Sequence, residues 1–400
     1  MILPLLWALL AGLALVLSWV TAAPGFAWAG YLMLVALAFA VLTVRLSGRG
    51  ISAHRELSVD RIAFGGRVGV EVELRNESRL PTLWVVATEA LPAGLPMTGP
   101  RGWVGPLGGR AVARFNYTVE GARRGYYEIG PTVLRTGDIF GLTHRQRLGG
   151  PPSSLTVFPR IVALEHTRFP SRRPTGEVRA RHRVVEDPTQ VVGVRPYQRD
   201  DGLRRIHWRA TAHTGRLQSK LFEVSAQADA VMVLDLRRTA YAGPPGEAEE
   251  AAELAITTAA SVAYHLLDRR QRVGLLALAR DPAADSSDSL VGVASGRGRD
   301  QLARLLSVLG RVELGAAPPL ADVLEKRKES LSWGSSLVVI TPELEERDLL
   351  KMLSLRGSGF EVNTLLVGRG AAVKQRAALE AMGIRASRVQ SEADIRVIDL

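Results

Sequence analysis

The chain opens with two long apolar runs in which no residue is charged. The runs cover roughly Ile2–Ala22 and Phe26–Val44, and Pro24-Gly25 lies between them. Each has about 20 residues, the length that a helix needs to cross about 30 Å of hydrocarbon. A signal peptide fits less well, because it would need a basic first segment and would leave the second run unexplained. The pattern therefore predicts a two-helix transmembrane hairpin over residues 1–44.

Beyond the hairpin, apolar positions recur with a period of two, which is typical of strands with one buried face. In residues 68–74, valine and leucine alternate with glycine and glutamate. In residues 111–119, alanine or a larger apolar residue stands at every second position. Turn-forming Gly, Pro and Asn residues separate such runs. Several short strands at this spacing predict an all-β, immunoglobulin-like sandwich over residues 45–165.

The C-terminal half alternates continuous apolar runs with helical patterns. The runs that predict strands are 228–236, 272–278, 336–341, 361–367 and 395–400. The patterns that predict helices are 247–270, 299–310, 319–331, 344–356 and 370–383. This alternation predicts a doubly wound α/β sheet over residues 228–400, with ligand sites at the carboxyl ends of its strands.

Composition narrows the chemistry. The chain has no cysteine, which excludes disulfides, thiolate metal sites and cysteine nucleophiles. The phosphate-binding pattern G-x-x-x-x-G-K-[ST] is absent, so we do not expect this chain to bind ATP. The formal net charge of +11 favours an anionic lipid surface, a nucleic acid or an acidic protein as partner.

The charges that flank the hairpin predict its orientation. Arg45, Arg49 and Arg55 follow the second apolar run, and the loop Thr21–Gly25 is uncharged. By the positive-inside rule, residues 45–400 face the cytoplasm. We therefore expect a multi-pass protein of the cytoplasmic (inner) membrane, with the lipid bilayer as one partner.

A basic linker, residues 166–227, joins the two predicted soluble domains and concentrates charge, an indole and an imidazole at 197–220. One interpretation is a membrane-associated hydrolase in which Asp201 and His207 supply acid–base groups. Another is binding of nucleic acid or anionic lipid, because residues 166–223 hold 13 Arg plus Lys against six Asp plus Glu.

The interpretation that we favour is a structural and interaction element. In this view Asp201 pairs with Arg204 or Arg209, and Trp208 is a buried anchor. Arginine offers bidentate geometry and tryptophan a large contact area, a combination that is enriched where protein surfaces lock together. A complete catalytic set is missing, so we expect no enzymatic activity.

The same stretch resembles the signature of a bacterial family called domain of unknown function 58 (DUF58). The matching residues are Gly193, Arg195, Tyr197, Asp201, Arg204, Ile206 and Trp208. Asp200 stands where the family usually has Gly, and His213 where it usually has Arg. The segments 123–131, 138–142 and 157–160 also resemble the region that precedes the signature in this family.

The resemblance implies a membrane hairpin, a β domain and a von Willebrand factor A-like α/β domain. The resemblance also implies that the protein acts together with a MoxR-type AAA+ ATPase, as members of this family look like companions of such ATPases. The implied function is a membrane-anchored, non-enzymatic adaptor for protein-complex assembly or envelope maintenance. Its expected partner is a protein, a MoxR-type ATPase, and not a nucleic acid.

The von Willebrand A resemblance also implies a Mg²⁺ site of the form D-x-S-x-S. Here Asp235 and Thr239 stand in that pattern, and Thr341 ends a later strand. Arg237 replaces the first hydroxyl ligand and brings a positive charge that repels a dication. We therefore expect a degenerate site without a cofactor, Mg²⁺ being the alternative, in which Arg237 pairs with Asp235 in place of the ion.

Overall fold

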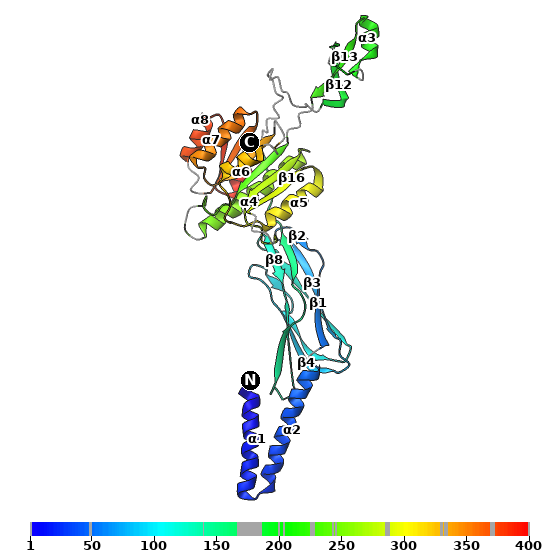
Figure 1. The fold of residues 1–400 in the computed structure, drawn as a ribbon, viewed down its shortest axis with the longest axis vertical. Helices are drawn as coiled ribbons and strands as arrows, with labels where there is room; N and C mark the ends of the chain where they lie inside the picture. Colours follow the sequence, from blue (N-terminus) through cyan, green and yellow to red (C-terminus); the bar gives the residue numbers. More distant parts are fainter. Residues whose placement is uncertain are drawn as a thin grey trace. The chain divides into compact units, whose positions relative to one another are not determined.

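The computed structural model of the chain is shown in Figure 1. It describes residues 2–47, 50–138, 140–165, 186–198, 201–202, 205–224, 229–241, 244, 246–284, 289–328, 331, 335–368 and 373–398. The chain divides into two compact units. The first comprises Met1–Arg160 with Asp281–Ser286 and Leu306–Val312, and the second comprises the remainder.

The first unit begins with two antiparallel helices, α1 (Ile2–Thr21) and α2 (Pro24–Ser47). Their segments Leu3–Thr21 and Pro24–Arg45 are long and apolar enough to cross a membrane, by length and composition. Close packing of the pair depends on Gly30, where an added Cβ would lie 2.8 Å from Leu15 Cγ. The predicted pair of long apolar helices is thus confirmed.

Three sheets follow in the first unit. One has the order β1 (Ile51–Leu57), β3 (Arg67–Asn76), β7 (Val112–Glu120) and β5 (Met97–Thr98). Another has the order β10 (His144–Leu148), β9 (Thr132–Gly137), β4 (Thr82–Glu89) and β6 (Gly102–Leu107). Both are antiparallel. The third joins β2 (Arg61–Ile62), β11 (Ser153–Val157) and β8 (Gly125–Ile129), with β2 and β11 parallel.

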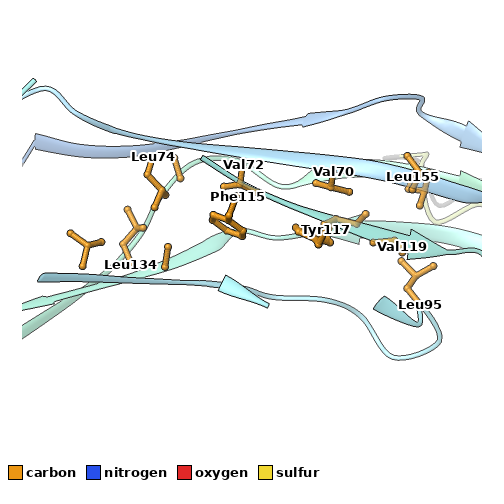
Figure 2. Packing of buried hydrophobic residues seen from close by; sticks show 14 of the residues in the cluster. Val70, Val72, Leu74, Leu95, Phe115, Tyr117, Val119, Leu134 and Leu155 are labelled. Carbon is orange, nitrogen blue, oxygen red and sulfur yellow. The ribbon is translucent and has the colours of Figure 1, made fainter. Parts of the chain in front are cut away.

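The two four-stranded sheets share one apolar core. The period-two residues of β3, from Val68 to Leu74, are at most 1% exposed. They pack with the alternate residues of β7 and with Leu134 of β9 in the facing sheet (Figure 2). The alternation read from the sequence therefore marks the buried face correctly, because successive side chains of a strand point to opposite faces.

A buried ion pair crosses this core. The Arg55 guanidinium lies 2.7 Å from the Glu89 carboxylate, and both side chains are at most 3% exposed. Arg55 also donates to the Ile129 carbonyl oxygen and to Thr132, and the Tyr117 hydroxyl donates to Glu89 at 3.0 Å. From the sequence we counted Arg55 among the charges that flank the hairpin. The structure shows instead that it is buried in the core. A guanidinium at the fifth position of a strand can point inward when a carboxylate compensates its charge.

The second unit is built on a six-stranded sheet with the order β16-β15-β14-β17-β18-β19. In chain order the strands are β14 (Ala230–Asp235), β15 (Val273–Leu278), β16 (Leu290–Gly296), β17 (Ser336–Thr341), β18 (Glu361–Val367) and β19 (Arg385–Val389). All pairings are parallel except that of β16. The direction of winding reverses between β14 and β17, and their carboxyl ends carry Asp235 and Thr341 side by side.

The helices of the C-terminal half lie where the sequence predicts them, within a few residues. They are α4 (Glu247–Asp268), α5 (Gly298–Arg311), α6 (Leu320–Arg327), α7 (Glu346–Gly357) and α8 (Val373–Ala381). A short α9 (Glu392–Ile395) follows β19.

Two elements differ from the prediction. The expected strand 395–400 is wrong: Ile395 ends α9, because the Asp394 carboxylate accepts hydrogen bonds from the Gln390 and Ser391 backbone N–H groups and closes a helical turn. The edge strand is β19 instead. Strand β16 was not expected, because its glycine-rich sequence resembles a loop. It is the antiparallel edge strand beside β15, and its side chains are only partly buried.

Candidate functional site: the signature segment and the Asp235 cluster

The signature residues build a small scaffold of two strands and one helix. Strands β12 (Glu186–Pro196) and β13 (Gln218–Val224) pair antiparallel, and α3 (Trp208–Thr214) lies between them in the chain. The β12–β13 register shifts next to Gly193, and Arg195 lies opposite Ser219. Ile206, 5% exposed, forms an isolated bridge to Ser219. Three of the signature residues thus belong to this β12–β13 pair or bridge to it: Gly193, Arg195 and Ile206.

Asp201 organises the turn that leaves β12. Arg195 Nη2 donates to Asp201 Oδ1 at 2.6 Å, and the Gln198 N–H donates to Oδ2 at 3.0 Å. The Tyr197 hydroxyl donates to the Asp201 carbonyl oxygen at 2.9 Å. The Gln198 backbone hydrogen bond and the Arg195 guanidinium hold the pKa of Asp201 below its usual value.

The structure gives Asp201 a partner that we did not predict. We expected Arg204 or Arg209, and the structure pairs Asp201 with Arg195 because the turn folds the carboxylate back onto β12. Arg204 lies outside the described residues, and Arg209 is exposed on α3.

His207 has a structural use as well. It precedes α3, and its Nδ1 accepts a hydrogen bond from the Ala210 N–H at 3.0 Å, which satisfies a helix-terminal donor. The helix ends at Gly215, whose φ of 68° lies in the left-handed region that favours glycine. The hydrogen bonds of Asp201 and His207 thus serve the local fold, and the lowered pKa of Asp201 disfavours a role as proton donor near neutral pH.

Trp208 is exposed to 69%, so the prediction that it is a buried anchor is wrong. The physical reason is that α3 is only seven residues long and buries none of them. Between residues 205 and 220 there are four Arg or Lys residues and no Asp or Glu. The exposed residues on and after α3 include Trp208, Arg209, Ala212, His213, Arg216 and Leu217. We call these six residues the Trp208 face.

The second cluster lies at the switch point of the six-stranded sheet. Arg237 grips the Asp235 carboxylate in a bidentate pair, with Nε to Oδ1 at 3.0 Å and Nη2 to Oδ2 at 2.8 Å. Thr341 Oγ1 also donates to Asp235 Oδ2, at 3.1 Å. Asp235, Arg237 and Thr341 are each at most 3% exposed. The expected pairing of Arg237 with Asp235 is confirmed.

Two acidic residues that we did not predict surround the same guanidinium. Asp348 and Glu345 lie 3.7 and 3.8 Å from Arg237. Burial raises the pKa of Asp348, although the Glu345 N–H and Arg237 act against this shift. The sequence signal for both is the capping box that starts α7, with Glu345 before the helix and Asp348 at its third position.

The oxygen atoms of the Asp235 cluster are not arranged to bind Mg²⁺. Both oxygens of Asp235 accept from Arg237, whose positive charge lies where a dication would need to bind. Thr239, which we expected in the site, is exposed in the turn after Arg237. Among the described residues, no group of three His, Asp or Glu side chains has the geometry to hold a metal ion.

Comparison with known proteins finds a family model that matches a segment containing both sites. Residues 193–365 match the family model described as protein of unknown function DUF58. The resemblance to DUF58 is confirmed. The matched segment begins at Gly193 of the signature and ends within β18, so it contains the Trp208 face and the Asp235 cluster.

The chain is also similar to the uncharacterized protein YeaD of Bacillus subtilis strain 168. The two are 23% identical over 322 residues, which cover 78% of this chain and 75% of YeaD. Among solved structures, an aerotolerance-related membrane protein from Bacteroides fragilis covers 42% of this chain and 94% of its own, at 17% identity and a TM-score of 0.29. The pilus adhesin SpaC from Lactobacillus rhamnosus GG has 9% identity and a TM-score of 0.32, over 42% of this chain and 29% of its own. Scores this low assign no fold to the chain.

Proposed function

We propose that the protein is a membrane-anchored, non-enzymatic adaptor that presents the Trp208 face to a protein partner in the cytoplasm. The observation that carries the proposal is an indole exposed to 69% on a scaffold whose polar groups are hydrogen-bonded to one another. Exposing a large aromatic side chain to water is unfavourable, and tryptophan and arginine dominate the energy of protein interfaces.

The Asp235 cluster favours a role in recruiting a partner over a catalytic role. Doubly wound sheets bind their ligands at the switch point, and here the bidentate pair of Arg237 and Asp235 fills that position. In this proposal the second unit is a von Willebrand A-like domain that has lost its ion. In the same proposal, the β sheets of the first unit form an immunoglobulin-like domain.

The partner that we propose is a MoxR-type AAA+ ATPase or its client. The resemblance to DUF58 points to this class, and the charge of the Trp208 face favours an acidic surface on the partner. An ATPase in trans also supplies the nucleotide chemistry for which this chain has no phosphate-binding motif.

Replacing Trp208 by alanine is expected to weaken partner binding by roughly 30-fold, the effect of losing an interface hot spot of about 2 kcal/mol. The thermal unfolding midpoint should stay unchanged, because α3 buries no residue. The partner is first isolated with the full-length protein from a detergent extract, and its affinity is then measured by biolayer interferometry. Tyr264→Ala is the matched control, since Tyr264 is an exposed aromatic residue on α4.

Four outcomes would contradict this function. Equal affinities of the Trp208 and Tyr264 variants would remove the face from the interface, and absence of any AAA+ ATPase from the extract would remove the partner. Steep salt-dependent retention on DNA would favour nucleic-acid binding. A hydrolytic turnover that is lost in Asp201→Asn with the fold intact would favour the hydrolase.

The membrane anchor has its own test. The full-length protein is expected to stay in the membrane pellet after alkaline carbonate washing, whereas a chain without residues 1–47 should be released, because two spans of about 20 apolar residues make insertion effectively irreversible. Protease protection in right-side-out and inverted vesicles tests the orientation. Release of the full-length chain, or cleavage of the β domain from outside, would contradict the proposal.

A further inference from the structure

The loops at one end of the β domain in the first unit gather around the end of α2. Ile51, at the start of β1, follows α2 after three residues and pairs with Asn76. The antiparallel register then carries the loops that follow β3, β6 and β9 to this same end. We call residues 75–82, 107–112, 137–138 and 140–145 the helix-proximal end.

One of these loops contacts α2 inside its membrane-crossing segment. Thr143 Oγ1 donates to the Ala40 carbonyl oxygen at 3.4 Å. The apolar segment of α2 runs from Pro24 to Arg45, so Ala40 lies five residues before its end. At a rise of 1.5 Å per residue, this places the contact about 7 Å nearer to the bilayer centre than Arg45.

The length of α2 requires the same depth for the loop that contacts Ala40. From Pro24 to Ala40, α2 rises only about 25 Å, which is less than the roughly 30 Å of a hydrocarbon core. If the β domain stayed clear of the bilayer, α2 would be too short to span it. Residues 137–138 and 140–145 must therefore lie in the headgroup region when the helices are inserted.

The helix-proximal end exposes two large apolar side chains at its tips, Phe140 (51% exposed) and Leu80 (48%). Neither sits on a loose loop. Asp138 accepts hydrogen bonds from the N–H groups of Phe140 and Leu142, and the Asn76 side chain donates to the Leu80 carbonyl oxygen. The turns thus hold both apolar side chains away from the core of the domain.

Basic residues surround these tips. Exposed cationic or titratable side chains at this end are Arg75, Arg79, Arg110, His144 and Arg145. The acidic residues of the three loops are Glu77, which accepts from Ser52, and Asp138, which is buried. Apolar tips ringed by arginine match the interface of a membrane that contains anionic phospholipid.

We propose that the helix-proximal end is a lipid-binding surface, in which Phe140 and Leu80 enter the membrane interface and Arg79, Arg110 and Arg145 bind headgroup phosphates. This inference rests on the proposed membrane anchoring by α1 and α2. It adds a second attachment to the same bilayer, which would fix the angle at which the β domain leaves the membrane.

The test uses single-cysteine variants of the full-length protein, which are clean because the chain has no cysteine. An environment-sensitive fluorophore is attached at Phe140→Cys, and the protein is reconstituted into phosphatidylcholine vesicles with or without phosphatidylglycerol. Nitroxide-labelled lipids then report whether the fluorophore contacts the bilayer. Leu32→Cys, an exposed position within α2, is the control for insertion.

The matched control for the tip is Phe64→Cys. Phe64 is exposed to 44% and lies beyond the far end of β1, roughly 20 Å along the strand from Ile51. We expect quenching at positions 32 and 140 and none at 64. Quenching at 32 without quenching at 140 would overturn this inference and leave the anchor intact. No quenching at 32 would overturn the anchor, and the inference with it.

A second set of variants tests the headgroup contacts. Replacing Arg79, Arg110 and Arg145 together by glutamine should weaken docking of the position-140 fluorophore in anionic vesicles, by roughly fivefold per arginine. The control triple replaces Arg61, Arg101 and Arg123, which are exposed at other places on the same domain, and should have no effect. An equal loss in both triples would overturn a specific headgroup site.

Discussion

Replacing Arg237 by alanine is expected to destabilise the second unit by about 3–5 kcal/mol, one of the two largest effects that we expect. The substitution leaves the Asp235 carboxylate, which is 0% exposed, without its bidentate partner. An unpaired buried charge retains its desolvation cost and loses the attraction that offset it. Thr341, which also donates to Asp235, cannot replace a guanidinium.

The adjacent residue supplies the control. Arg238 is also an arginine paired with an acid, at 3.5 Å from Glu249, but its side chain is 64% exposed. Arg238→Ala should therefore leave the stability of the second unit nearly unchanged. Adding Asp235→Asn to the Arg237 variant should recover part of the loss, because the buried charge is then gone.

Hydrogen exchange of the detergent-solubilised protein measures this effect unit by unit. In the Arg237 variant, peptides that cover β14 should exchange faster, and peptides that cover β7 should not change, because the strands belong to different units. Equal exchange of β14 in the Arg237 and Arg238 variants would contradict the importance that we give to the pair.

Replacing Glu89 by glutamine is expected to destabilise the first unit by a similar amount, about 3–5 kcal/mol. Glu89 lies in the core and compensates Arg55, which would be left as a lone buried cation. The Tyr117 hydroxyl, which donates to Glu89, would keep only a weaker acceptor. The thermal unfolding midpoint of the first unit should fall by roughly 10 °C.

The matched control is Glu73→Gln in the same domain. Glu73 lies 2.8 Å from Arg114, nearly the separation of Glu89 and Arg55, but the Arg114 side chain is 62% exposed. Water already solvates this pair, so its loss should leave the thermal unfolding midpoint nearly unchanged. If the two glutamine variants unfolded at the same temperature, burial would not be the cause of the difference that we predict.

The candidate sites could be predicted from the sequence only in part. The pairing of Arg237 with Asp235 was predictable, because two residues of opposite charge stood where a fold-specific ion site was expected. The pairing of Asp201 with Arg195 was not, since the two residues lie six positions apart and no periodic pattern relates them. Trp208 was misjudged, because an indole is as consistent with a core as with a surface until the packing around it is known.

The amino-acid sequence by itself determined the two apolar helices, the period-two strands, and most of the alternating strands and helices of the second unit. These features follow from the period of apolar residues, which is a local property of the chain. Only the tertiary structure decided that Arg55 is buried against Glu89, that Thr143 lies beside Ala40, and that β19 forms the sheet edge. Each of these depends on residues far apart in the chain, and which charged groups then leave water depends on the packing of whole sheets rather than on any local pattern.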